Sequence, residues 1–324
     1  MSLLGVGLAM LAFSTCASAE LSQLQAHFER PDSGVDYLEA KLLVDGLIDP
    51  ETDVAAVRRE IDTWERAVRA EMPVGADARG TLDALLKTLY QPSVWNQDQP
   101  FAYDLDDPLG RSADSKRLAA YLKTRRGNCV SMPILFVILG QRLDLPVAFA
   151  TAPHHVLVKF ADDVQQVWLN VEATAGGFKW DESYERETGI TPAALENGLY
   201  LRPLTRREGV GVIAGTLMEH FAGAQDADAL MQVADLALTA NPQDSAAMLW
   251  KANAYYLQLQ ARYVERYPTA ADIPAELHAD YLYRRQENLA WFAKAEALGW
   301  SPRPPEQVAE YLRSIEREKA QREQ

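Results

Sequence analysis

Hydrophobic residues recur at three- and four-residue intervals through most of the segment from about residue 22 to 92, which predicts amphipathic helices. Turn residues interrupt this pattern at 31–34, 49–53 and 73–77. The last two interruptions provide Asp or Thr residues as possible helix N-caps. We therefore expect a helical lead-in that packs on the residues after it.

A second helical segment, residues 130–139, is apolar on nearly every side, a pattern typical of a fully buried helix. Pro133 restricts where this helix begins, because proline is tolerated in the first turn, where its missing N–H is not needed. The helix is therefore predicted to begin close to Cys129. The helix before it, residues 115–126, is predicted to stop at Gly127.

After Pro146 the hydrophobic period becomes that of strands. Residues 146–152, 154–160 and 164–174 are rich in β-branched and aromatic side chains, and Ala161-Asp162-Asp163 predicts a hairpin turn between the last two. Beyond Thr205 the pattern returns to helix. A buried helix followed by antiparallel strands, with helices on either side, predicts an α+β fold.

Composition and charge are those of a globular protein. The 324 residues, 48% hydrophobic and 24% charged, suffice for two domains with ordinary cores. Lys and Arg number 32 against 46 Asp and Glu, a net charge of −14. Nucleic acids and anionic membrane surfaces would be repelled, so nucleic acid is excluded as a partner.

The N-terminus predicts export. Its first 19 residues are uncharged and mostly apolar and end in Ala17-Ser18-Ala19, which fits a signal peptide cleaved after Ala19. A membrane anchor is the main alternative. No later segment is long and apolar enough to cross a membrane, so we expect a periplasmic protein with no stable span once the leader is removed.

Only two cysteines occur, Cys16 and Cys129, and removal of the leader leaves Cys129 without an intramolecular disulfide partner. A thiol at a helix N-terminus ionises more readily, and the thiolate is the nucleophile. Gly127 would let the backbone approach a substrate closely, and Arg125 and Arg126 would add positive potential. Cys129 is therefore the candidate nucleophile, and an inert buried thiol is the alternative.

A cysteine nucleophile needs a base and a group that orients the base. Of five histidines, His27, His220 and His278 lie in helical segments, whereas His154 and His155 open the strand that can return to Cys129. With a two-residue turn at 162–163, His155 faces Asn170. With a turn at 163–164 or a loop at 162–165, it faces Glu172. Both registers put Asn170 and Glu172 on the face of His155, although a solvent-exposed polar face would explain the alternation equally well.

These parts resemble the transglutaminase-like superfamily, a papain-related fold. The stretch RRGNCVSMPILFVILGQRLDLPV is similar to its G-x-C at the head of a buried helix, PHHVLVKF to its strand-opening histidine, and VWLNVEAT to its W-x-x-[LV]-D-x-T. The resemblance implies Cys129 as nucleophile, His155 as base and Glu172 as orienting acid. Glu172 stands where the family usually has Asp, so Asn170 is the other candidate, as an Asn serves in papain-like enzymes.

The organisation resembles a bacterial subfamily that joins this core to a helical lead-in and a tetratricopeptide-like tail. The tail segment 229–257 places small residues at Ala234 and Ala237 and ends one helix at Asn241-Pro242. We expect a signal peptide at 1–19, the transglutaminase-like domain with its helical part at 20–205, and a helical domain at 206–324.

The expected function is exported, thiol-dependent acyl transfer on amide or peptide bonds, of protease, amidase or transglutaminase type. The resemblance implies a peptide or protein substrate, with cell-wall peptide as one candidate. The alternative is a catalytically silent fold that binds peptides or a protein partner through its helical tail. No cofactor is expected, and no metal site, because adjacent strand residues such as His154 and His155 point to opposite faces.

Overall fold

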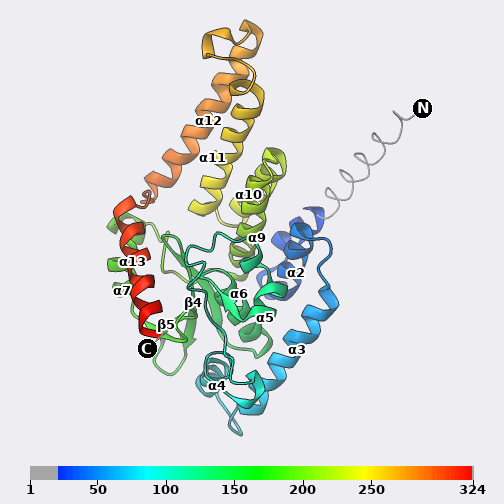
Figure 1. The fold of residues 1–324 in the computed structure, drawn as a ribbon, viewed down its shortest axis with the longest axis vertical. Coiled ribbons are helices and arrows are strands. Elements are labelled where there is room, and N and C mark those ends of the chain that lie inside the picture. The colour runs from blue at the N-terminus through cyan, green and yellow to red at the C-terminus, as the bar shows by residue number, and fades with distance from the viewer. Residues whose placement is uncertain (1–20, 323–324) are drawn as a thin grey trace, which may run out of the picture. The chain divides into compact units, whose positions relative to one another are not determined.

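The computed structural model describes residues 21–322 and confirms the α+β fold class (Figure 1). The predicted leader at 1–19, with Cys16, lies outside the described residues. The chain forms two compact units. Among the described residues, one holds 21–52 together with Arg206–Phe292, and the other holds Asp53–Thr205 and 293–322.

The second unit is built on a four-stranded antiparallel sheet in the order β3-β4-β5-β6. The strands are β3 (Val147–Ala152), β4 (His155–Asp162), β5 (Val167–Glu172) and β6 (Gly177–Lys179). A separate parallel pair joins β1 (Ala102–Tyr103) and β2 (Arg126–Gly127). The helices of this unit are α3 (Val54–Glu71), α4 (Ala78–Tyr90), α5 (Leu118–Thr124), α6 (Ser131–Arg142), α7 (Asp181–Thr188), α8 (Pro192–Glu196) and α13 (Pro305–Arg322).

Helix α6 is the centre of this unit, and it packs on β3, β4 and the helices α3, α4 and α5. All its residues from Ser131 to Gly140 are buried, as the apolar run predicted. Pro133 lies in its first turn. The two lead-in helices α3 and α4 begin in the predicted turns, where aspartates cap them: Asp53 accepts from the N–H of Ala56, and Asp77 from that of Gly80.

The pairing of β4 with β5 differs from both predicted registers. Lys159 lies opposite Asn170, where the predicted register with His155 facing Glu172 would put Leu157. The cause is Asp162, which stays in the strand while its carboxylate accepts the N–H groups of Val164 and Gln165. The turn therefore occupies residues 163–166. The partner of Asn170 is thus two residues further along β4 than predicted, and a shift by an even number keeps each side chain on the same face of the sheet. His155, Asn170 and Glu172 therefore still share one face, as predicted.

Helix α5 ends earlier than predicted, at Thr124, because Arg125 adopts a left-handed conformation with φ 54°. The Arg125 guanidinium donates to the carbonyls of Asn96 and Gln99, and its own carbonyl accepts from Ala102. Arg125 thus fixes the loop ahead of β1 through its guanidinium, which keeps its positive charge.

Gly127 is held in a tight space two residues before Cys129. A Cβ atom there would lie 2.4 Å from Cε2 of Tyr121 and 2.8 Å from Cγ of Met132 and Oγ of Ser131. Such distances force neighbouring atoms to move. The sequence favoured Gly127 for backbone approach to a substrate, whereas the structure shows that close packing requires it.

Replacing Gly127 by alanine should therefore lower the free energy of unfolding by about 1–3 kcal/mol, the usual cost of overpacking. Urea unfolding followed by circular dichroism measures the change. Gly177→Ala is the matched control in the same unit, because a Cβ at Gly177 meets nothing within 4 Å. Equal stabilities of the two variants would contradict this account of Gly127.

The first unit consists of helices. It contains residues 21–29, α2 (Tyr37–Ile48), α9 (Arg206–Gly223), α10 (Ala227–Ala240), α11 (Ser245–Leu259) and most of α12 (His278–Ala297). Helix α9 packs on α2, α10 and α11. Asp226 and Asp244 cap α10 and α11, and Asn241 closes α10, the break that the sequence indicated.

The compact units are a different division from the expected domains. The lead-in residues 21–52 belong to the same unit as α9 to α11, and residues 293–322 belong to the sheet-bearing unit. The domain boundaries at 20–205 and 206–324 remain a prediction. Within residues 21–322, no helix combines the length and apolarity that crossing a membrane requires.

Candidate active site

Cys129 lies between β2 and the first turn of α6, where the chain turns into the buried helix. Asn128 organises this turn: its side-chain oxygen accepts the N–H groups of Val130 and Ser131, and its own N–H donates to Oγ of Ser131. Within the part of the chain that the structure describes, no acceptor is bonded to the N–H of Cys129. That N–H is therefore available to a ligand at the thiol.

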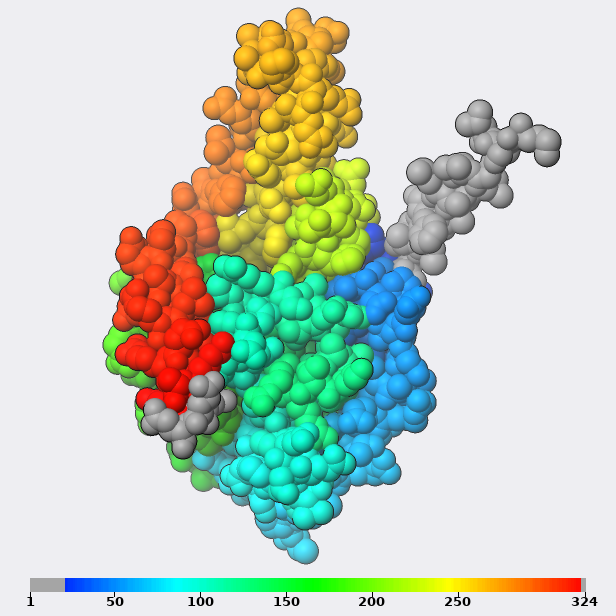
Figure 2. Space-filling view, viewed as in Figure 1, coloured from blue at the N-terminus to red at the C-terminus, as the bar shows by residue number. Residues whose placement is uncertain are grey.

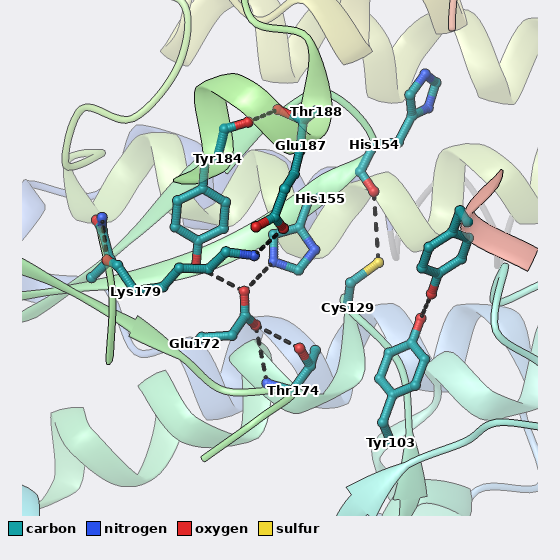
Figure 3. A network of polar contacts seen from close by, with 12 residues as sticks. Tyr103, Cys129, His154, His155, Glu172, Thr174, Lys179, Tyr184, Glu187 and Thr188 are labelled. Atoms are coloured by element: carbon teal, nitrogen blue, oxygen red, sulfur yellow. Dashed lines mark hydrogen bonds and ion pairs between the residues drawn. The ribbon is translucent and has the colours of Figure 1, made fainter. Parts of the chain in front are cut away.

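The thiol of Cys129 is partly exposed and faces the turn between β3 and β4. Its Sγ lies 3.8 Å from the carbonyl oxygen of His154. His155, the first residue of β4, follows immediately, and Figure 3 shows its ring beside Cys129. The structure thus brings together the cysteine and the histidine that the sequence selected.

Glu172, at the end of β5, is the carboxylate that contacts His155. Nε2 of His155 lies 2.9 Å from Oε2 of Glu172. This bond leaves Nδ1 as the ring nitrogen that can serve the thiol. Cys129, His155 and Glu172 therefore stand in series, the order of a nucleophile, a base and an orienting acid.

Glu172 has a full set of hydrogen-bond donors (Figure 3). Oε1 accepts from the N–H of Thr174 at 3.1 Å and from its hydroxyl at 2.6 Å, and Oε2 accepts from the hydroxyl of Tyr184 at 2.8 Å. Burial alone would raise the pKa of Glu172. The bond and charge of His155, together with the Thr174 and Tyr184 bonds, outweigh burial and lower this pKa to about 2. Glu172 is therefore ionised at neutral pH.

The pKa of His155 is raised to about 10. Burial acts in the opposite direction, but hydrogen bonding to Cys129 and to Glu172 and the charges of both groups overcome it. The imidazole is therefore protonated at neutral pH. A protonated imidazole beside the sulfur has a proton to give to a leaving group.

Asn170, the other candidate for the third position, does not contact His155. Its side-chain nitrogen donates to the carbonyl of Lys179 at 2.9 Å and to Oδ1 of Asp181 at 2.6 Å. The same Asp181 oxygen lies 2.9 Å from Nζ of Lys159. Asn170 thus belongs to a neighbouring polar cluster on the same sheet face, which ties the sheet to the start of α7.

The remaining histidines are not part of this arrangement. His154 occupies the tight turn with φ 57°, and its ring points away from Cys129 (Figure 3). Burial, and then the charge of Arg303, lower the pKa of His154. His27, His220 and His278 belong to the other compact unit.

Sequence analysis did not find Tyr184. It lies on α7, a helix that the hydrophobic pattern did not predict because its acidic sequence buries only Tyr184. Thr174 was present in the quoted motif as the residue after Glu172-Ala173, which was the available signal for its contact. Within residues 21–322, no cluster of three or more His, Cys, Asp or Glu side chains could hold a metal ion.

The low pKa of Glu172 predicts a pH dependence of stability. A carboxyl group whose pKa falls on folding stabilises the protein above its unfolded pKa, here near 4.5, and loses that contribution as the pH falls through the folded value near 2. Glu172→Gln should therefore cost about 2–3 kcal/mol at neutral pH. The difference from wild type should shrink between pH 4.5 and pH 2, since protonated Glu resembles Gln.

Urea unfolding of both proteins across this pH range measures the difference in the free energy of unfolding. A difference that stays constant down to pH 2 would show that the charge of Glu172 does not stabilise the fold.

Comparison with known families agrees with this geometry. The model of the transglutaminase-like superfamily, Transglut_core2, matches residues 55–208, which include Cys129, His155 and Glu172. No curated protein matches the chain, and no solved structure does. The matched segment covers the sheet, the buried helix α6 and the helices α3 to α5. Residues 55–208 of this chain are a transglutaminase-like superfamily domain.

Proposed function

We propose that this protein is a thiol-dependent acyl-transfer enzyme that acts on amide or peptide bonds through Cys129, His155 and Glu172. The observation that carries the proposal is the position of His155, whose ring lies beside Cys129 and is hydrogen-bonded to the buried carboxylate of Glu172. A buried imidazole with a raised pKa beside a partly exposed thiol suits a nucleophile and its proton donor better than a structural contact.

The reaction follows from these groups. The Cys129 thiolate attacks the carbonyl carbon, a C–S bond forms, and the carbonyl electron pair moves to oxygen, where the free N–H of Cys129 can bind it. As the tetrahedral species collapses, the C–N bond breaks and His155 gives its proton to the departing amine. Water or a second amine then attacks the thioester and gives its proton to His155. As the new C–O or C–N bond forms, the C–S bond breaks and the Cys129 thiolate is restored, so hydrolysis and transamidation share every residue.

An activated ester tests the proposal without knowledge of the natural substrate. 4-Nitrophenyl acetate should acetylate the purified protein at Cys129, located by peptide mapping and mass spectrometry. Iodoacetamide should label Cys129 at pH 6 much faster than it labels glutathione, since an ordinary thiol is less than about 1% ionised there. Cys129→Ala should abolish both adducts. Labelling no faster than that of glutathione would remove the basis of the proposal.

The location, the subfamily and the substrate class are proposed in the same way. We propose that the protein is exported to the periplasm, and that it belongs to the bacterial transglutaminase-like subfamily with a helical lead-in and a tetratricopeptide-like tail. Helices α9 to α11, which pack on one another, support the last point. Its substrate would be a peptide or protein, with cell-wall peptide as the candidate. Incubation with cell-wall peptides and with glutamine-donor and amine probes, read by mass spectrometry, distinguishes hydrolysis from transamidation.

A second candidate function is peptide or protein binding through the helical tail by a domain without activity. Large hydrophobic side chains exposed on α11 and α12 favour it: Tyr256, Leu282, Tyr283 and Leu289. Calorimetric titration of the Cys129→Ala protein with the same peptides tests this function. Binding that is lost in a Leu282→Ser, Leu289→Ser variant would support it, and binding that survives those changes would exclude this surface.

A further inference from the structure

Two tyrosine hydroxyl groups meet at the candidate active site. Tyr103 ends β1, and Tyr311 comes from α13, near the other end of the chain. Their hydroxyl oxygens lie 2.8 Å apart. The carbonyl oxygen of Pro108 lies 2.7 Å from the Tyr103 hydroxyl and 3.0 Å from the Tyr311 hydroxyl. Three oxygens thus form a triangle.

The backbone places this triangle next to the nucleophile. Tyr103 is the register partner of Gly127 in the β1–β2 pair, and the backbone N–H of Asp104 donates to the Gly127 carbonyl at 2.7 Å. Tyr103 is therefore fixed beside the residues that lead to Cys129. Figure 3 shows Cys129 with His155 on one side and Tyr103 on the other. Burial, and next the charge of Cys129, raise the pKa of Tyr103, which keeps its hydroxyl protonated.

Tyr311 experiences the same charge. Burial raises its pKa most, the hydrogen bond with Tyr103 opposes this, and the charge of Cys129 raises it further. The charge of Cys129 therefore acts on both hydroxyl groups. Tyr103, to which Tyr311 is bonded, lies on the other side of Cys129 from His155 (Figure 3).

The triangle holds one more proton than its carbonyl needs. Either hydroxyl can donate to the carbonyl of Pro108, and the other hydroxyl then donates a hydrogen bond to its tyrosine partner. If negative charge forms on a substrate oxygen beside the sulfur, Tyr103 can turn its proton to that oxygen while Tyr311 keeps the bond to Pro108. The exchange leaves no polar group of the triangle without a partner.

We propose that Tyr103 is a further catalytic residue, which donates a hydrogen bond to the oxyanion together with the N–H of Cys129, and that Tyr311 is a positioning residue that holds Tyr103 ready. This inference rests on the proposed acyl-transfer function. In the addition step the C–S bond forms and the carbonyl π pair moves to oxygen. Tyr103 keeps its proton and only hydrogen-bonds to that oxygen, and the bond weakens again when the oxyanion collapses and the C–N bond breaks.

The proposal gives α13 a role in the site, although it lies outside the matched residues 55–208. This helix lies on the surface of its unit (Figure 2), and among its described side chains Ile315 alone is buried. Besides the Tyr311 bonds, Lys319 pairs with Asp106 at 3.1 Å and Arg303 stands 5.3 Å from the Tyr311 ring centre. The Tyr311 bonds and the Lys319–Asp106 pair thus connect α13 to residues 103–108.

Two reagents separate oxyanion stabilisation from other roles of these tyrosines. Acetylation by 4-nitrophenyl acetate passes through an oxyanion, whereas alkylation by iodoacetamide does not. Tyr103→Phe should slow acetylation of Cys129 on the order of 10²-fold, the usual effect of losing one oxyanion donor, and leave alkylation unchanged. Tyr311→Phe should slow acetylation by a smaller factor and also leave alkylation unchanged. The double variant should be acetylated no more slowly than Tyr103→Phe.

Tyr267→Phe is the matched control, because Tyr267 is a partly exposed tyrosine of the other unit. Equal losses of acetylation and alkylation in Tyr103→Phe would overturn the proposal, since the tyrosine would then act on access or on thiol ionisation. Unchanged acetylation would overturn it too. A wild-type Cys129 that is alkylated but never acetylated would instead refute the acyl-transfer function on which the inference rests.

Discussion

Replacing His155 by glutamine is expected to slow both acetylation and alkylation of Cys129 at pH 6 by on the order of 10²-fold. The imidazolium is present at this pH because the pKa of His155 is about 10. A thiol without a cationic neighbour ionises near pH 8.5 and is less than about 1% thiolate at pH 6. The loss should therefore shrink as the pH rises through about 8.5, where the thiol ionises unaided.

Rates of adduct formation between pH 5 and pH 10 measure this effect. His154→Asn is the matched control, because the ring of His154 points away from Cys129 and asparagine tolerates the φ of 57° at this position. The control should keep the wild-type pH profile. If His155→Gln follows wild type at all pH values, His155 does not act on the thiol, and the assignment of a base is wrong.

The parts of the site that the sequence predicted are those that depend on local rules. Proline at Pro133 fixed the start of a helix, which put Cys129 at its head, and strand alternation put His155 and Glu172 on one face. The prediction that these residues share a face was correct although the predicted register was wrong, because the register differed by an even number of residues. Asp162 caused that error, since the sequence does not show whether an aspartate at a turn stays in the strand.

The other parts depend on contacts between distant segments. Tyr184 reaches Glu172 from a helix whose acidic sequence has no apolar period, and Tyr311 reaches Tyr103 across 208 positions of the chain. Arg125 was expected to add positive potential, and the sequence did not show that its guanidinium also binds the carbonyls of Asn96 and Gln99. Hydrophobic periodicity carries no information about such contacts, because they involve single polar groups rather than a repeated face.

The choice between Glu172 and Asn170 leads to the second large effect. Glu172→Gln removes the negative charge that faces His155, so the pKa of His155 should fall below about 10, although the hydrogen bond and charge of Cys129 still raise it. Each unit lost weakens the imidazolium–thiolate pair tenfold, and acetylation of Cys129 at neutral pH should slow by on the order of 10- to 10²-fold. Tyr184→Phe, which removes one donor to the same carboxylate, should give a smaller loss in the same direction.

Asn170→Ala provides the opposing test. Asn170 bonds Lys179 and Asp181 rather than His155, so its removal should cost about 1 kcal/mol of stability and leave the acetylation rate of the folded protein unchanged. If Asn170→Ala slows acetylation while Glu172→Gln does not, the site works in the papain-like manner with an amide as orienting group. We predict the reverse, a loss in Glu172→Gln and none in Asn170→Ala. The reason is that a negative charge, unlike a neutral amide, can hold the imidazole protonated well above its usual pKa.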